Sequence, residues 1–306
     1  MYKKNCLDFH YRYDPAFEQF CIKLCYLNVL RYYNEPFAML YINSVPVFKV
    51  EWHEGIPAFS YYMEPLIASQ THKAITCGRC GNQINEIVQY IDREYPCLAV
   101  VDGYYLSYHP SYQKQHEEHM AIIYGYDWDG HTILVADNMP PYFFDGAIEI
   151  SRLKPAIKVW GILNKTRCEI DARTMILETA VHTRRFLYES HVKGYAAFLI
   201  FSDWILSFQV LDEKKYIYFH KQMGSMSSYL NLLLLYMLEA CKMEPAVNAL
   251  CCFLKSWLLK WKNLKINLLK SLYSGKWNDE YKLLLSMVLS DWGELKKQLD
   301  NLVTIL

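Results

Sequence analysis

Two cysteines stand four residues apart in the segment FCIKLCYLNVLRYYNEPF, residues 20–37. A cysteine acts as a nucleophile only as its thiolate, and it needs a base and a group that orients the base. Apolar residues recur at helical spacing from about residue 18 to 34, and Pro36 predicts the end of that helix. Cys21 falls in its first turn, where backbone N–H groups and the helix dipole favour a negative charge. We therefore predict that Cys21 is the nucleophile and that Cys25, one turn further in on the apolar stripe, is a core residue.

The best placed base among ten histidines is His119. It ends a polar, tyrosine-rich loop and leads directly into the β-rich run 120–126, which is followed by an Asp-Gly turn and a second run, 132–137. Two such runs predict a hairpin, which brings the ends near His119 and Asp137 together. A Cys, a His and an Asp occur in nearly any chain of this length. We nevertheless predict His119 as the base and Asp137 as its orienting group, because each falls at the end of a predicted element.

Ten cysteines raise the question of a metal site. Cys77 and Cys80 have the spacing of a zinc knuckle or a redox pair, but no second pair stands at convincing spacing. His116 and His119 are three residues apart in a segment without helical character, which is not the spacing of a helical zinc pair. We expect reduced, structural thiols and no metal.

Composition and charge indicate a folded protein with two parts. Of 306 residues 53% are apolar and 21% charged, no apolar run approaches the length of a membrane span, and no signal peptide is evident, which together favour a cytoplasmic protein. The formal net charge is zero, yet residues 1–150 hold 10 Lys and Arg against 18 Asp and Glu, while residues 151–306 hold 22 against 14. Either the acidic and basic faces meet each other, or the basic half receives an acidic partner.

The periodicity predicts an α+β domain over residues 1–165 and an all-α domain over residues 166–306. Expected elements in the first domain are helices over 18–34 and 82–95 and strands over 97–102, 120–126 and 132–137. Residues 37–75 are aromatic-rich and are expected to be irregular, with a loop at 55–57. From about residue 171 almost only helical spacing remains, including a long helix between Pro245 and Gly275.

Two segments resemble known families. Residues 20–33 resemble the catalytic-cysteine helix of papain-like peptidases that cut double-glycine leader peptides, and residues 100–127 are similar to the N-terminal-domain family of butirosin biosynthesis protein H. The resemblance extends over about residues 15–150. It implies a papain-like domain, in which a helix bearing the cysteine packs on an antiparallel sheet, with Cys21, His119 and Asp137 as the catalytic residues.

The resemblance also implies a reaction. Such a protein is a cysteine-dependent acyltransferase that moves an acyl or aminoacyl group from a carrier-protein thioester, through an acyl-enzyme at Cys21, to an amine in antibiotic or other natural-product biosynthesis. It needs no cofactor of its own, because the acyl group arrives on the phosphopantetheinyl arm of an acyl or peptidyl carrier protein. The expected partners are that carrier protein and a small-molecule or peptide amine, with no nucleic acid and no membrane. Carrier proteins are typically acidic, which suits the basic second half.

Auxiliary residues follow from the same resemblance. Papain-like enzymes often carry a glutamine six residues before the cysteine as an oxyanion donor, but here that residue is Pro15 and Gln19 stands two residues before Cys21. Gln19 is therefore the candidate oxyanion donor. Candidate substrate-binding residues lie in the polar loop: Tyr104, Tyr105, Tyr112 and His116.

Two further classes remain open. The same three residues with water or another acceptor would make a cysteine peptidase, amidase or thioesterase. A binding module would keep the fold without the activity, although the presence of all three residues argues against it.

Overall fold

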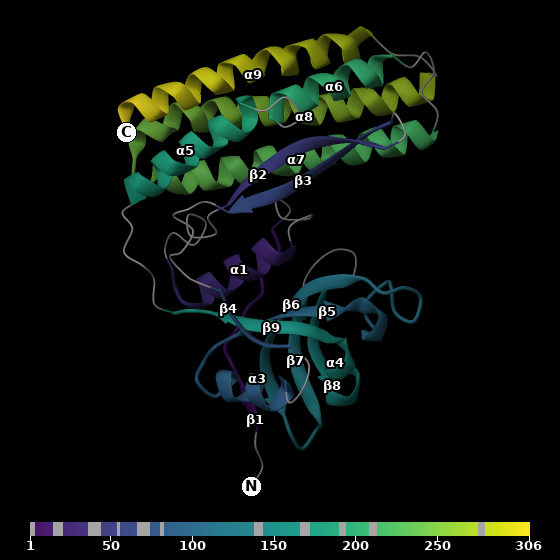
Figure 1. The fold of residues 1–306 in the computed structure, drawn as a ribbon, viewed down its shortest axis with the longest axis vertical. Coiled ribbons are helices and arrows are strands. Elements are labelled where there is room, and N and C mark those ends of the chain that lie inside the picture. Colours follow the sequence, from purple (N-terminus) through teal and green to yellow (C-terminus); the bar gives the residue numbers. More distant parts are fainter. Residues whose placement is uncertain are drawn as a thin grey trace. The chain divides into compact units, whose positions relative to one another are not determined.

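The protein is described here from a computed structural model. It describes residues 4–14, 21–35, 44–53, 56–65, 74–79, 83–137, 143–165, 172–189, 194–207, 213–274 and 279–306. The chain forms two compact units, residues 1–42 with 70–169 and residues 43–69 with 170–306 (Figure 1). The grouping of residues 43–69 with the second unit is not foreseen by the sequence analysis.

The first unit combines helices with an antiparallel sheet. Its elements are β1 (Lys4–Cys6), α1 (Cys21–Tyr32), β4 (Ala74–Arg79), α3 (Gln83–Ile91), β5 (Cys97–Asp102), the 3-10 turn η2 (Gly103–Tyr105), β6 (Glu118–Asp127), β7 (Thr132–Asp137), β8 (Phe144–Glu149), α4 (Ile150–Ala156) and β9 (Ile157–Leu163). The strand order is β4-β9-β5-β6-β7-β8, with β1 pairing with β6, and every pair is antiparallel. The predicted α+β class is confirmed.

Strand β6 lies at the centre of this unit. Ala121, Ile122 and Ile123 are all buried, although consecutive side chains of a strand point to opposite faces. Both faces of β6 are therefore covered, and α1 and α3 both pack against it. This agrees with the unbroken apolar run of β6, which is typical of a strand buried on both sides.

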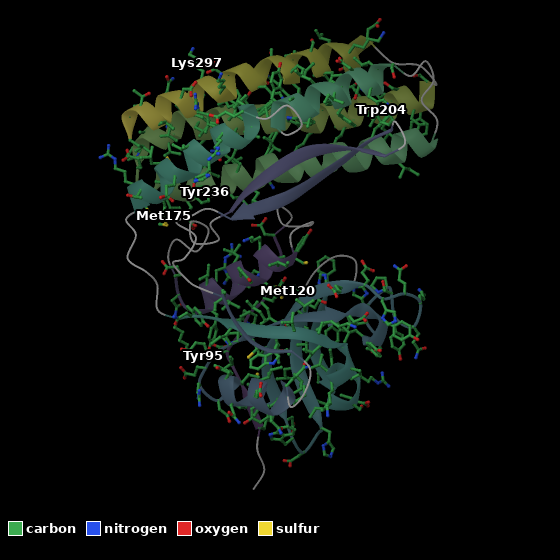
Figure 2. All side chains as sticks on the ribbon, in the orientation of Figure 1. Tyr95, Met120, Met175, Trp204, Tyr236 and Lys297 are labelled. Carbon is green, nitrogen blue, oxygen red and sulfur yellow. The ribbon has the colours of Figure 1, made fainter. Side chains whose placement is uncertain are left out.

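One end of β6 lacks a strand neighbour on one side. On the β5 side the ladder continues to the pair Asp102–Glu118, but on the β7 side it stops at the pair Ile122–Ala136. In the described part of the chain, residues 118–121 therefore pair with a strand on the β5 side alone. Helix α1 contacts β6 and reaches the backbone of Met120 in this stretch (Figure 2).

A buried asparagine fixes α1 to the N-terminal segment. The backbone N–H of Arg12 donates to Asn28 Oδ1 at 2.7 Å, and Asn28 Nδ2 donates to the carbonyls of Arg12 at 3.1 Å and Leu24 at 2.9 Å. The segment thus runs across α1 with its backbone groups satisfied, as buried polar groups require. Apolar side chains of the same helix, among them Leu24 and Leu27, complete the packing.

The second unit is mostly helical. It holds α5 (Ala172–Tyr188), α6 (Gly194–Leu206), α7 (Glu213–Cys241), the 3-10 turn η3 (Pro245–Val247), α8 (Asn248–Ser274) and α9 (Asp279–Ile305), together with the hairpin β2 (Ser44–His53) and β3 (Ile56–Pro65). The predicted helical C-terminal region is confirmed. Apolar residues at three- and four-residue spacing predict a core-facing stripe on α8, and all but the half-buried Leu272 are buried: Leu250, Leu254, Trp257, Trp261, Leu264 and Leu268. None of the described helices carries an apolar stretch long enough to span a membrane.

The prediction that residues 37–75 are irregular is wrong for the β2–β3 hairpin. Its two ten-residue strands pair from Ser44–Pro65 to His53–Ile56, so Ile56 and Pro57 lie in a strand rather than in the predicted loop. Pro46 and Pro57 obscure the strand pattern, because proline is excluded from central strands. In a ribbon of two strands both are edge strands, where a residue without an N–H is tolerated.

Replacing Asn28 by Ala should destabilise the first unit by about 2 kcal/mol, because the backbone groups of Arg12 lose their buried partner. Urea denaturation measures the change. Asn85→Ala on the exposed face of α3 is the matched control and should stay within about 0.5 kcal/mol of the parent. Equal effects of the two substitutions would contradict the role assigned to Asn28.

Candidate active site

The pairing of β6 with β7 places His119 near Asp137. Because Ile122 pairs with Ala136, continuation of the register puts Asp137 opposite Ala121, on the same face as His119 and diagonal to it. His119 Nε2–H donates to Asp137 Oδ1 at 2.7 Å. The Asp137 side chain is fully buried and that of His119 is 11% exposed. The two residues predicted from the strand ends are therefore in direct contact.

Cys21, the first described residue of α1, completes the group. Its thiol and the ring of His119 are hydrogen-bonded to each other. Since Nε2 of that ring is engaged with Asp137, Nδ1 is the nitrogen left to face the sulfur. The structure thus brings Cys21, His119 and Asp137 together in one unit, and Cys21 remains partly exposed.

The backbone of Met120 forms a different hydrogen bond with each of the two cysteines. In an antiparallel ladder the N–H and C=O of one residue point to the same side. The Met120 carbonyl accepts a hydrogen bond from the Cys25 thiol at 3.5 Å, and the Met120 N–H donates to Cys21. An N–H donor favours a thiolate, whereas a carbonyl acceptor favours the protonated thiol. The free edge of β6 therefore supports Cys21 as the charged sulfur and Cys25 as the neutral one.

The ionisation of Cys21 and His119 follows from these contacts. Burial raises the pKa of the Cys21 thiol, but the hydrogen bond and charge of His119 and the N–H groups of Met120 and Ile22 outweigh it, so its pKa is lowered. Burial lowers the pKa of His119, but its contacts with Asp137 and Cys21 outweigh that effect and raise the pKa above its usual value. These contacts favour a thiolate–imidazolium pair, and the two groups titrate as a coupled unit.

Cys25 has the opposite environment. It is completely buried, and burial together with the charges of Cys21 and Asp137 raises its pKa well above that of a free thiol. Its neighbour Tyr11 lies with the hydroxyl oxygen 3.8 Å from the sulfur. Cys25 is therefore a protonated, buried thiol, which the helical phase of the sequence predicted.

Sequence reasoning missed a fourth side chain in this group. The Tyr108 hydroxyl donates to Asp137 Oδ2 at 2.9 Å, on the carboxylate oxygen that His119 does not use. The only sequence signal for Tyr108 was its place within the tyrosine-rich loop. Its selection over the neighbouring tyrosines depends on the three-dimensional course of that loop.

Three of the candidate substrate-binding residues form a cluster beside the site. The rings of Tyr104 and His116 stack at 4.5 Å, and the rings of Tyr104 and Tyr105 meet edge to face at 5.2 Å. His116 Nδ1 lies 2.7 Å from Oδ2 of the buried Asp102, to which Lys158 also binds at 3.0 Å. Asp102 ends β5, where the neighbouring Val101 pairs with His119, so the cluster lies at the same end of the sheet.

Tyr112, the fourth candidate, lies in the same loop. Its N–H donates to the His109 carbonyl at 3.0 Å, and its hydroxyl accepts from Gln113 Nε2 at 3.2 Å. Gln19, the candidate oxyanion donor, and Cys80 of the spaced cysteine pair lie outside the described residues, and so does the side chain of Cys77.

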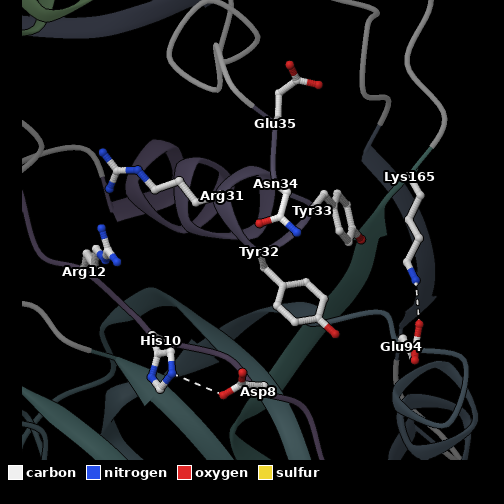
Figure 3. A pocket seen from close by; sticks show the side chains of 10 residues that line it. All are labelled: Asp8, His10, Arg12, Arg31, Tyr32, Tyr33, Asn34, Glu35, Glu94 and Lys165. Carbon is white, nitrogen blue, oxygen red and sulfur yellow. Dashed lines mark ion pairs between the residues drawn. The ribbon is translucent and has the colours of Figure 1, made fainter.

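A groove of about 850 Å³ lies at the opposite end of α1 (Figure 3). Its lining includes Arg12, Arg31 and Tyr32, and two ion pairs join further lining residues, Lys165–Glu94 at 3.6 Å and His10–Asp8 at 3.2 Å. Tyr32 is eleven residues from Cys21, a helical rise of about 16 Å. The groove is therefore separate from the Cys21–His119–Asp137 group.

In this α+β unit, Cys21 thus contacts His119, and His119 contacts Asp137. Over residues 75–138 the chain matches the family described as "Butirosin biosynthesis protein H, N-terminal". The matched segment contains Tyr108, His119 and Asp137, and Cys21 lies before it. No curated protein matches the chain.

The lowered pKa of Cys21 predicts alkylation at unusually low pH. Iodoacetamide should modify Cys21 at a pH at which an ordinary thiol, with pKa 9.0, reacts only slowly, and Cys25 should stay unmodified in the folded protein. Reactivity should fall as pH drops through the Cys21 pKa. Peptide mass spectrometry reports both sites, and exposed Cys6, whose pKa is raised by burial, is the internal control. A common midpoint for Cys21 and Cys6 would contradict the ion pair.

Gly103 is expected to tolerate no side chain. A Cβ there would lie 2.4–2.8 Å from three ring atoms of buried His109, so the loop that carries Tyr108 would have to shift. Gly103→Ala should destabilise the first unit by about 1–3 kcal/mol, as overpacking does, and should reduce Cys21 alkylation. Gly293→Ala, where no atom lies within 4 Å, is the control and should lower neither quantity. An unchanged melting temperature for Gly103→Ala would contradict the clash.

Proposed function

We propose that the protein is a papain-like, cysteine-dependent acyltransferase. It would move an acyl or aminoacyl group from a carrier-protein thioester to an amine in the biosynthesis of an antibiotic or another natural product. The observation that carries the proposal is the thiol of Cys21 between the His119 ring and the Met120 N–H, with Asp137 behind the ring. The family match over residues 75–138 supports the biosynthetic setting and the choice of substrate class.

In the first half-reaction, the Cys21 thiolate attacks the carbonyl carbon of the thioester and forms a tetrahedral oxyanion. Collapse breaks the bond between that carbon and the phosphopantetheine sulfur, and the His119 imidazolium gives its proton to the departing thiolate, which leaves as the thiol. Cys21 then carries the acyl group as a new thioester, and His119 is neutral. Gln19 is the proposed side-chain donor to the oxyanion.

In the second half-reaction, the amine attacks the Cys21 thioester while neutral His119 takes the proton that the nitrogen loses. The Cys21 thiolate is expelled, the amide leaves, and the thiolate–imidazolium pair is restored. Asp137 holds the ring so that Nδ1 faces the sulfur in both steps. Tyr104, Tyr105 and His116 are proposed to bind the substrates at the neighbouring end of the sheet.

Water competes with the amine for the same acyl-enzyme. A thioesterase, amidase or peptidase would use these three residues with water as the second acceptor, so the distinction depends on the fate of the acyl-enzyme. The test therefore has to follow both amide and free acid.

A thioester that mimics the end of the carrier arm, acetyl-N-acetylcysteamine, should acetylate the wild-type protein. Intact-mass spectrometry should show one acetyl adduct, mapped to Cys21, and addition of a primary amine should discharge it as the amide. Cys21→Ala should lose the adduct and reduce turnover by at least about a thousandfold, the scale of removing a catalytic nucleophile. Cys25→Ala should keep it.

Three results would count against this assignment. An adduct that persists in Cys21→Ala and disappears in Cys25→Ala would contradict the choice of nucleophile. Release of acid alone, at every amine concentration and with every amine class tested, would favour the hydrolase. A folded wild-type protein that forms no adduct would favour a binding module.

A further inference from the structure

We propose that Tyr108 is the positioning residue of this site: by holding the second oxygen of Asp137, it keeps the first oxygen on His119 and so maintains the thiolate at Cys21. The inference rests on the proposed function and adds to it a residue that acts through Asp137 rather than on the substrate.

Each of the two oxygens of Asp137 accepts from a different side chain of the described residues. Oδ1 accepts from His119 Nε2–H at 2.7 Å, and Oδ2 accepts from the Tyr108 hydroxyl at 2.9 Å. The carboxylate is fully buried, so each oxygen depends on a protein donor for its stability as an anion. Rotation of the carboxylate would break both hydrogen bonds at once. The Tyr108 contact therefore fixes the orientation that His119 requires.

The ring of Tyr108 is itself held on the adjacent strand. It stacks on Phe144 with 4.0 Å between ring centroids and 4° between ring planes. Phe144 is the residue directly opposite Asp137 in the β7–β8 ladder. The Tyr108 ring therefore stacks on the cross-strand neighbour of Asp137, and this stacking fixes the position of the hydroxyl.

The backbone on both sides of Tyr108 is also fixed. The N–H of Leu106 donates to the Gly103 carbonyl at 3.1 Å, and that of His109 donates to the Leu106 carbonyl at 2.9 Å. Leu106 and His109 are buried, and the Gly103 N–H donates to the Glu117 carbonyl at 2.8 Å, which closes the base of the loop. This is a compact, self-bonded loop of the kind that often carries functional side chains.

Loss of the hydroxyl should act on the site in a defined direction. Without the Tyr108 hydroxyl, the carboxylate of Asp137 is free to rotate away from His119, so its hydrogen bond would support the imidazolium less. The thiolate–imidazolium pair would then exist over a narrower pH range. The acid limb of Cys21 reactivity would therefore move to higher pH.

The test is the pH profile of Cys21 alkylation by iodoacetamide in wild type and in Tyr108→Phe. The phenylalanine keeps the ring that stacks on Phe144 and removes only the donor. The acid limb of the alkylation profile should move up by about one pH unit. At a fixed pH on that limb, the alkylation rate should therefore fall about tenfold, the scale of one hydrogen bond to a charged group. Proton NMR of the His119 Nε2–H, which needs no activity, should show its signal shifted from the wild-type position.

Tyr124→Phe is the matched control. It removes a tyrosine hydroxyl that donates to another carboxylate, Asp145 Oδ1 at 2.7 Å, from a residue of β6. Its Cys21 profile should coincide with that of wild type. A Tyr108→Phe profile that also coincides with wild type, whatever its melting temperature, would overturn the inference and leave the proposed function intact. A wild-type Cys21 that titrates like an ordinary thiol would overturn both.

Discussion

The site depends on the contact between helix α1 and the start of β6. In the described part of the chain the β6–β7 ladder ends at the pair Ile122–Ala136, and the N–H and C=O of Met120 bond helix α1 rather than a strand. Helix α1 fills this edge and satisfies both groups with sulfur: the N–H donates to Cys21, and the carbonyl accepts from Cys25. Two cysteines one turn apart thereby receive opposite electrostatic environments from a single residue. The two hydrogen bonds satisfy the backbone groups of Met120, and they also favour the thiolate at Cys21 and the protonated thiol at Cys25.

The buried charges around this edge form an alternating series. The Met120 N–H faces the Cys21 thiolate, the thiolate faces the His119 imidazolium, the imidazolium faces the Asp137 carboxylate, and the carboxylate faces the Tyr108 hydroxyl. Removing charges from water is costly unless each one is paired and hydrogen-bonded. Here each charge lies between partners of opposite sign or dipole, and rigid elements hold all of them: α1, β6, β7 and the loop closed between Gly103 and Glu117. The pairing stabilises the charged form without the solvent reorganisation that an exposed pair would need.

The sequence predicts the features that depend on residues close together in the chain, and it does not predict those that depend on distant segments. Helix phase separates Cys21 from Cys25, and the apolar runs of β6 and β7 with their Asp-Gly turn bring His119 and Asp137 together, since these features depend on neighbours within a few residues. Tyr108 and the backbone of Met120 were missed, because their roles depend on where β7 stops and how a loop returns to the sheet. The β2–β3 hairpin was missed because its prolines imitate loop signals, and β8 and β9 were not predicted either.

The raised pKa of His119 bears on how the proposed reaction moves its protons. Contacts with Asp137 and Cys21 raise the pKa of the ring to about 10, so the ring carries a proton when the reaction begins. In the proposed reaction the imidazolium gives that proton to the departing phosphopantetheine sulfur, and the neutral ring then takes a proton from the attacking amine. One histidine, held in one orientation by Asp137, would thus act as the acid of the first half-reaction and as the base of the second.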